Sequence, residues 1–332
     1  MNQVIERNSI FELVRIIAMS FIVIYHLFLF FVARHYPDES LFKGIQIPLH
    51  IGVILFVLIS GYFGIKCNLR GLFKLIMMVA VYYLPIALFT DLNGGGNFNQ
   101  IIKDCLFISH SPYWFIRTYI CLYLFSPVLN KYLNDINAKE RIYLLATLGY
   151  ISIYLGTSLG DPSLSDGKNL ANFSFLYVLG NTLHYYEDKW RKISHRLLLI
   201  IYFFMNIILV CAYSLFAGSL FGKVIWRISF PYCSPILVLN AVLFFMILSR
   251  WQLNSKIINY IASSMFAVYL IHCQPFIEKR VIGCIMTKIF SLTGENVLYI
   301  IISTLLIGIS IMAICVIIDK LLSPIWRIIN IK

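Results

Sequence analysis

Residues 11–32 read FELVRIIAMSFIVIYHLFLFFV, an apolar stretch of the length that crosses the hydrocarbon core of a membrane. Arg15, near its start, and His26, further in, stand out. At about 100° per residue, eleven steps make three turns plus about 20°, so the two side chains share one helix face with about 16 Å of rise between them. Because ionisable groups inside a membrane are costly, this pair is the first candidate for a functional site.

Both residues belong to one stripe of this helix. Its members are Glu12, Arg15, Met19, Ile22 and His26, whose 3, 4, 3, 4 spacing keeps them on one face. Glu12 and Arg15 can form an i, i+3 ion pair, which would lower the cost of the arginine and orient its guanidinium. We expect the stripe to face the protein interior or a water-filled cleft. The simpler interpretation makes Arg15 an anchor at the inner surface and His26 a hydrogen-bonding residue between helices.

The composition is that of an integral membrane protein. Of the 332 residues, 60% are hydrophobic and 13% charged, and the mean hydropathy is +0.82. The formal charge of +12 does not indicate nucleic-acid binding, because the basic residues are spread over short connections between apolar runs. The eight cysteines form no C-x-x-C pair, so their spacing predicts neither a disulfide framework nor a zinc site, and we expect no metal.

The order of apolar runs predicts an all-α, polytopic protein of about ten transmembrane helices. We expect the spans at residues 13–31, 47–65, 72–89, 114–133, 142–159, 173–186, 197–215, 235–248, 257–276 and 297–318. With the N-terminus inside, 17 of the 27 Lys and Arg residues fall in inner connections and nine in outer ones, which predicts that both termini are cytoplasmic. No connection is long enough for a soluble catalytic domain, so residues 1–332 should form a single membrane-embedded domain.

A histidine in the position of His26 suits several chemistries, since an imidazole takes and returns a proton near neutral pH. In acyl transfer it would deprotonate a hydroxyl for attack on a thioester, or accept the acyl group itself. The residues alone do not choose between these roles.

Four stretches, taken together, resemble the membrane acyltransferase-3 family. In chain order they are SIFELVRIIAMSFIVIYH at 9–26, FVLISGY at 56–62, YWFIRTYICLYLFSP at 113–127 and SSMFAVYLIH at 263–272. The first resembles the family's opening helix, with an acidic residue, Leu-x-Arg and a histidine about ten residues beyond the arginine. The others resemble its Ser-Gly-aromatic signature, its Trp-led fourth span and its late Tyr-Leu-x-His segment. The predicted number of spans agrees with the family as well.

The resemblance implies a multi-pass O-acyltransferase of the bacterial inner membrane. It would take an acyl group, commonly acetyl from cytoplasmic acetyl-CoA, and place it on a hydroxyl of a cell-surface or lipid-linked polysaccharide, with acetyl-CoA as donor substrate and no bound cofactor. His26 becomes the catalytic residue, and Arg15, paired with Glu12, its partner on the donor side. Arg70 and Lys74 can meet the phosphates of coenzyme A by charge. Relatives often carry a denser arginine cluster there, and an ordinary positive inner loop explains the two residues equally well.

Five further residues are candidates for lining the acceptor site or its pocket. Ser60 precedes a glycine that permits close helix approach, so packing is its simpler role, and Tyr62 completes the same signature. Trp114 fits an interfacial aromatic belt or a stacking surface for a sugar. Arg117 would snorkel outward or bind an anionic group of the acceptor. His272 lies about 22 Å into the ninth span, at a depth similar to that of His26, and we expect a supporting or structural role.

Two other functions stay open at this point. A glycan or lipid transporter or flippase would also carry midplane charges and interrupted helices, but such folds often contain paired internal repeats and none is visible. The same type of enzyme with another acyl donor, such as succinyl-CoA, would use the same helix stripe. The sequence does not decide which sugar is the acceptor or whether the chain forms a homo-oligomer. It also does not decide whether the acyl group is transferred directly or through an acyl-enzyme.

Overall fold

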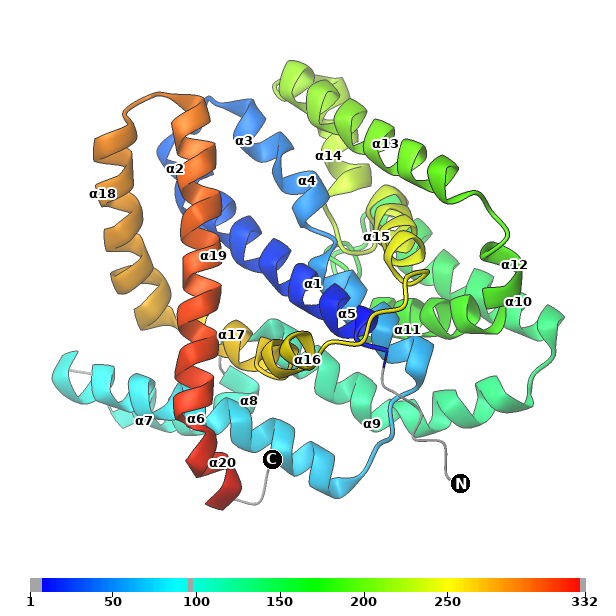
Figure 1. Cartoon of the computed structure of the whole chain (residues 1–332), viewed down its shortest axis with the longest axis horizontal. Helices are drawn as coiled ribbons and strands as arrows, with labels where there is room; N and C mark the ends of the chain where they lie inside the picture. Colours follow the sequence, from blue (N-terminus) through cyan, green and yellow to red (C-terminus); the bar gives the residue numbers. More distant parts are fainter. Residues whose placement is uncertain (1–7, 95–97, 111, 329–332) are drawn as a thin grey trace. The chain divides into compact units, whose positions relative to one another are not determined.

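The computed structural model describes residues 8–94, 98–110 and 112–328, and this described part is helical without a β-strand, which confirms the all-α class. Its helices, labelled in Figure 1, are divided between two compact units. The first comprises Met1–Lys66 and Leu124–Ala262, and the second comprises Cys67–Tyr123 and Ser263–Lys332. Each unit has its own set of helices and its own buried side chains. The single domain expected over residues 1–332 stays a prediction.

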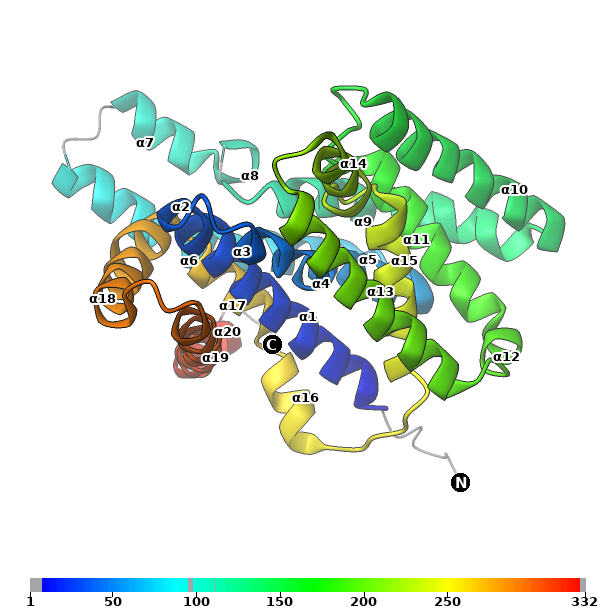
Figure 2. The ribbon, with the colours of Figure 1, turned by 90° about the horizontal axis from the view of Figure 1, so that it is seen from above.

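The first unit contains the N-terminal helix and most of the middle of the chain. Its helical segments are α1 (Ile10–Leu27), the π-helical η1 (Phe28–Val32), α2 (Ala33–His35), α3 (Ser40–Gly44), α4 (Gln46–Leu49), α5 (Gly52–Phe63), the later part of α9 (Trp114–Asp135), α10 (Ala138–Gly149), the π-helical η2 (Tyr150–Leu159), α11 (Leu170–Tyr185), α12 (Glu187–Trp190), α13 (His195–Phe216), α14 (Leu220–Ser229), α15 (Pro235–Leu248) and α16 (Lys256–Ala262). Figure 2 shows α10 and α11 side by side within this unit.

In the first unit, the backbones of α5 and α11 approach each other closely where the two helices cross. A Cβ atom at Gly61 would lie 2.0 Å from the carbonyl oxygen of Tyr177, and one at Gly180 would lie 2.2 Å from that of Leu58. Small residues at such positions allow two helix backbones to come into contact. In a lipid bilayer, where the hydrophobic effect does not drive helices together, such close packing stabilises their association. The close approach predicted for the Ser60-Gly61 pair is therefore confirmed.

Polar side chains define where several helices of the first unit begin. Asn137 forms a capping box with Glu140 at the start of α10, and the Asn169 side chain accepts a hydrogen bond from the backbone of α11. The Ser234 side chain caps α15 by accepting a hydrogen bond from the backbone of Leu237. The first residue of α15 is a proline, which fits there because an N–H in the first turn has no partner within the helix. Between α13 and α15, the amides of Asn206 and Asn240 donate to each other at 3.0 and 2.8 Å.

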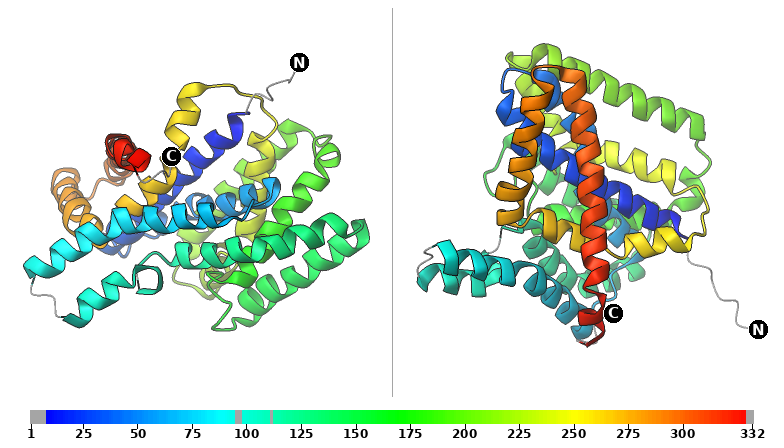
Figure 3. Two further views of the ribbon diagram at one scale, coloured as in Figure 1. Left: turned by 90° about the horizontal axis from the view of Figure 1, so that it is seen from below. Right: turned by 60° about the vertical axis from the view of Figure 1, so that its left-hand side comes forward.

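The second unit contains α6 (Leu69–Gly94), α7 (Phe98–Cys105), α8 (Phe107–His110), the first turns of α9, α17 (Met265–His272), the π-helical η3 (Ile277–Ile282), α18 (Gly283–Thr293), α19 (Val297–Leu321) and α20 (Ser323–Ile328). Figure 3 shows α18 and α19 running side by side. Asp319 of α19 is fully buried and accepts hydrogen bonds from the hydroxyls of Tyr82 at 2.7 Å and Ser264 at 2.6 Å. These bonds connect α19 to α6 and to the start of α17.

Helix length and hydropathy in the described residues give fewer spans than ten. Six helical stretches are long and apolar enough to cross a membrane: Ile10–His35, Ser40–Phe63, Leu69–Gly94, Ala138–Leu159, His195–Phe216 and Val297–Leu321. The pair Lys256–His272 and Ile277–Thr293, bent by 81°, makes a seventh if it is counted as one broken span. Helix α15, predicted as the eighth span, has 14 residues and is about 21 Å long, short of a hydrocarbon core of about 30 Å. The ten-span count and the cytoplasmic termini stay predictions.

Candidate active site

The stripe that begins at Glu12 lies on α1 as the spacing predicted, and its first two members form the expected ion pair. Arg15 Nη1 lies 2.7 Å from Glu12 Oε1. The Glu12 side chain is only 7% exposed and that of Arg15 is 32% exposed, so the pair lies at the edge of the buried interior. Met19 and Ile22, between this pair and His26, are both buried. The carboxylate therefore holds the guanidinium in one orientation at the N-terminal end of α1.

His26 occupies the last turn of the same uninterrupted helix, about 16 Å along the axis from Arg15. Its neighbour Tyr25 is fixed by stacking on His50, with ring centroids 4.3 Å apart and planes 9° from parallel. Two residues beyond His26, at Phe28, the α-helix continues as the π-helical turn η1. Single π-helical turns inside longer helices are frequent at functional sites, because they change the direction in which nearby side chains point. α1 thus carries an ion pair at one end and a histidine beside a π-turn at the other.

The two candidates on α5 differ in their surroundings. The Ser60 hydroxyl donates to the carbonyl of Phe56 at 2.8 Å, a bond within the helix that agrees with a packing role. Tyr62 packs its ring on Phe11, at 5.3 Å between centroids, and its hydroxyl donates to Glu187 at 2.5 Å. Because Phe11 precedes Glu12, this places Tyr62 at the Arg15 end of α1, about 22 Å along the helix from His26.

Glu187, the first residue of α12, is a site residue that the sequence analysis did not single out. Besides the Tyr62 hydroxyl it contacts Arg191, at 2.6 Å, and His184, at 3.7 Å. Partial burial raises the pKa of this carboxyl, but the hydrogen bond from Tyr62 and the charge and hydrogen bond of Arg191 outweigh it and hold the pKa below its usual value. The acidic pair Glu187-Asp188, directly ahead of four Lys and Arg residues at 189–196, was the available signal.

The two donor-side candidates of the second unit lie on one face of α6. Arg70 is in its first turn and exposed, and Lys74 follows one turn later at i+4. The preceding turn is fixed by Asn68, whose side chain accepts from the backbone of Gly71 at 2.7 Å and whose backbone N–H donates to the Tyr123 hydroxyl at 3.1 Å. Two cations one turn apart suit a phosphate, although only the arginine offers bidentate hydrogen bonds.

Trp114 and Arg117 lie in the first turn of α9, also in the second unit. Arg117 is exposed, and its Nη1 donates to the carbonyl of Ser109 at 2.9 Å. The residue before Trp114, Tyr113, is fully buried, donates to the carbonyl of Leu270 at 2.7 Å and packs on Tyr269. The start of α9 is thereby tied to α17, the helix that carries His272.

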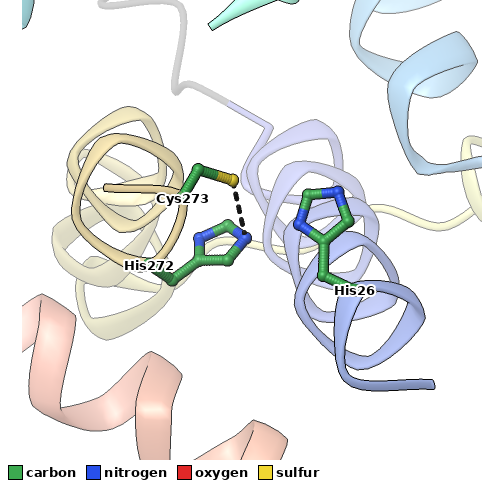
Figure 4. A group of neighbouring side chains, drawn as sticks. All are labelled: His26, His272 and Cys273. Atoms are coloured by element: carbon green, nitrogen blue, oxygen red, sulfur yellow. Dashed lines mark hydrogen bonds between the residues drawn. The ribbon is translucent and has the colours of Figure 1, made fainter. Parts of the chain in front are cut away.

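His272 is buried at the end of α17. Its Nδ1 lies 2.7 Å from the carbonyl of Val268 and its Nε2 lies 3.2 Å from Cys273 Sγ, the bond drawn as a dashed line in Figure 4. A carbonyl only accepts, so Nδ1 carries the proton and Nε2 is the acceptor in the neutral ring. The helix stops directly behind it, because Pro275 has no N–H and the Gln274 side chain accepts from the backbone of Phe276 at 2.7 Å. These contacts hold the imidazole in one orientation, and its supporting role stays a prediction.

The candidates are distributed over the two units. The first unit holds Glu12, Arg15, His26, Ser60 and Tyr62, and within it Tyr62 joins the Glu12–Arg15 end of α1. The second unit holds the remaining candidates, which are Arg70, Lys74, Trp114, Arg117 and His272.

The long apolar helices are those of a membrane protein, and one of them, α1, carries an ion pair and a histidine on one face. The model of the acyltransferase-3 family, described as an acyltransferase domain, matches residues 8–320, and the chain belongs to this family. The resemblance of the four stretches is thus confirmed, and the protein is a membrane acyltransferase. In the other comparisons, no curated protein and no solved structure matched the chain.

Proposed function

We propose that this acyltransferase moves an acetyl group from cytoplasmic acetyl-CoA to a hydroxyl of a cell-surface or lipid-linked polysaccharide, in the inner membrane of a bacterium. The observation that carries the proposal is the α1 stripe in a chain of this family. A fixed Glu12–Arg15 pair lies at one end of the stripe, and an imidazole lies on the same face about 16 Å away. The two ends can serve the two substrates.

The Arg15 end is assigned to the donor. Glu12 orients Arg15, which is placed to meet an anionic or carbonyl oxygen of acetyl-CoA, and Tyr62 stabilises the same end of α1 through Phe11 and Glu187. Arg70 and Lys74 of the second unit supply further positive charge for the phosphates. No metal or bound cofactor takes part in this scheme.

His26 is assigned to the chemistry. As a general base, its imidazole takes the proton of the acceptor hydroxyl while that oxygen attacks the thioester carbonyl carbon. The new C–O bond forms, the C–S bond breaks, and the proton passes to the leaving thiolate of coenzyme A. As an acyl acceptor, the same imidazole would carry the acetyl group between the two substrates. In either case Trp114 and Arg117 are assigned to the acceptor, and His272 to support.

The test is acetyl-CoA turnover and glycan acetylation in membranes that contain the wild type or His26→Ala. General acid–base catalysis contributes about 10²- to 10⁴-fold, so we expect a loss of that order. His35→Ala is the matched control, because His35 is an exposed histidine of the same span and should leave activity unchanged. If His26→Ala turned over acetyl-CoA as fast as the wild type, the assignment of His26 as the catalytic residue would be refuted.

Two added arms separate the rival functions. Succinyl-CoA offered in competition with acetyl-CoA identifies the acyl group, and mass spectrometry of the surface glycans identifies the modified hydroxyl. Glycan translocation that continues without any acyl donor would favour a transporter over an enzyme. Accumulation of an acetylated protein in the absence of acceptor would favour the acyl-enzyme route over direct transfer.

A further inference from the structure

Two arginines of the first unit lie against one tryptophan, away from the α1 stripe. Trp190, the last residue of α12, is buried, and its indole N–H donates to the carbonyl of Leu183 at 2.7 Å. The guanidinium carbons of Arg191 and Arg250 lie 5.3 and 5.8 Å from the centre of its ring. The fixed indole therefore holds two cations that come from the ends of different helices, α12 and α15.

The charge of this cluster is not balanced by its own carboxylates. Glu187 pairs with Arg191 at 2.6 Å, and Arg191 also donates to the carbonyl of Ser249 at 3.1 Å. Arg250 donates to the carbonyl of Trp190 at 2.8 Å, and no acidic side chain pairs with it within the described ranges. Burial and the nearby charge of Arg191 both lower the pKa of Arg250, which marks an uncompensated positive charge.

Arg250 and its chain neighbour Ser249 each have a buried polar atom without a partner in the described part of the chain. Among the described residues, Arg250 Nε and Ser249 Oγ are buried and have no hydrogen-bond partner. Ser249 is fully buried. Nearly all buried donors in native proteins are satisfied, so unsatisfied ones beside an excess of positive charge indicate a missing acceptor. An anion with several oxygen atoms supplies what both groups lack.

The rim of the cluster is positive and partly aromatic. Lys192 follows α12 and Arg196 is the second residue of α13, and both are exposed. Trp251, next to Arg250 in the chain, is 54% exposed. In residues 187–196, all of which are described, Asp188 of α12 is the one exposed acid. A basic side chain that only anchors a helix extends into water. The Arg250 guanidinium instead donates to the Trp190 carbonyl and lies over the Trp190 ring. Arg250 is therefore fixed in place beside the other cations of this segment.

We propose that Arg250, Arg191 and Ser249 bind a phosphate group. A guanidinium offers two parallel N–H donors to phosphate oxygens, and the serine hydroxyl donates a third hydrogen bond. The phosphate belongs either to the nucleotide end of the acyl-CoA donor, in which case this inference rests on the proposed function, or to the headgroup of an anionic phospholipid. The exposed Trp251 offers an adenine a surface for stacking.

The experiment uses the full-length protein in detergent and Arg250→Gln, which keeps a donor for the Trp190 carbonyl and removes the charge. Lys139→Gln is the control, because Lys139 is an exposed cation at the start of α10. Isothermal titration with 3′,5′-ADP, a nucleotide that carries the phosphates and no thioester, reports the first source. Native mass spectrometry of protein from phosphatidylglycerol-containing nanodiscs reports the second.

We expect Arg250→Gln to weaken 3′,5′-ADP binding at least tenfold and Lys139→Gln to stay within twofold of the wild type. Loss of the phospholipid adduct in Arg250→Gln, with nucleotide binding unchanged, would support the phosphate site and assign it to lipid. Equal binding of both probes by wild type and Arg250→Gln overturns the proposal. If Arg250→Gln does not fold, Ser249→Ala replaces it, because that hydroxyl makes no bond within the described residues; a loss of several-fold is expected, and no loss overturns the site.

The outcome is independent of the chemistry assigned to His26. His26→Ala should bind 3′,5′-ADP as the wild type does even when it transfers no acetyl group. Loss of transfer with intact binding would leave both proposals standing, whereas Arg250-dependent binding in a protein without any acyl transfer would support the phosphate site alone.

Discussion

The α5–α11 crossing gives a sharp prediction for Gly61→Ala. A Cβ atom at Gly61 would lie 2.0 Å from the Tyr177 carbonyl oxygen, and 2.7 and 2.8 Å from its carbonyl carbon and Cα. Ordinary contacts of a Cβ begin at 3.4 Å, so the two helices would have to separate by about 1.4 Å at this point. The obstacle is backbone rather than the end of a flexible side chain, so no rotamer change relieves it.

The expected cost follows from that displacement. Overpacking a well-packed site costs about 1 to 3 kcal/mol, and we expect Gly61→Ala near the upper value, about 3 kcal/mol, because two whole helices must move. The next residue is Tyr62, whose hydroxyl lies 2.5 Å from Glu187. The displacement should break this hydrogen bond as well, so acyl transfer should fall together with stability.

The assay is denaturant unfolding of the purified protein in mild detergent, followed by tryptophan fluorescence, with acetyl-CoA turnover measured on the same samples. Gly218→Ala is the control, because a Cβ there meets no atom within 4 Å; it should leave stability unchanged or raise it by about 0.4 to 1 kcal/mol. If Gly61→Ala unfolds at the same denaturant concentration as the wild type, the backbone contact on which this reasoning depends is absent.

Two further predictions concern polar contacts of the first unit. The pKa of Glu187 is lowered by its hydrogen bond from Tyr62 and by Arg191, so its stabilising effect is present above its ordinary pKa of about 4.5 and is lost as the pH falls below it. Glu187→Gln should therefore flatten the acid side of the stability profile, and an unchanged profile would contradict this assignment. Asn206→Leu leaves Asn240 without its partner and should cost about 1 to 3 kcal/mol, whereas the double variant with Asn240→Leu should recover most of that loss. A double-mutant cycle of unfolding free energies measures the coupling, and strictly additive losses would rule it out.

The local features of the site could be predicted from the sequence. Glu12 and Arg15 pair because helical spacing alone places i and i+3 side chains together, and His26 shares their face for the same reason. The family could also be predicted, because its motifs are short, local and in chain order. Hydropathy predicted an all-α membrane protein, since composition determines whether a helix can lie in lipid.

Contacts between distant segments could not be predicted in this way. Tyr62 meets Glu187, 125 residues further along the chain, and Arg191 and Arg250 share the Trp190 ring, although nothing in the spacing of these residues links them. Helix bounds are a different case, because they depend on local sequence: the apolar run predicted at 235–248 coincides with α15.

The sequence by itself determined the class, the family and the Glu12–Arg15–His26 stripe, because each depends on composition or on the fixed geometry of one helix. Only the tertiary structure decided that Tyr62 lies at the Arg15 end of α1. It also decided that Arg250, which pairs with no carboxylate among the described residues, lies beside Arg191. The physical reason is that helix packing depends on which side chains interlock across elements, down to single glycines such as Gly61, and no local periodicity contains that information.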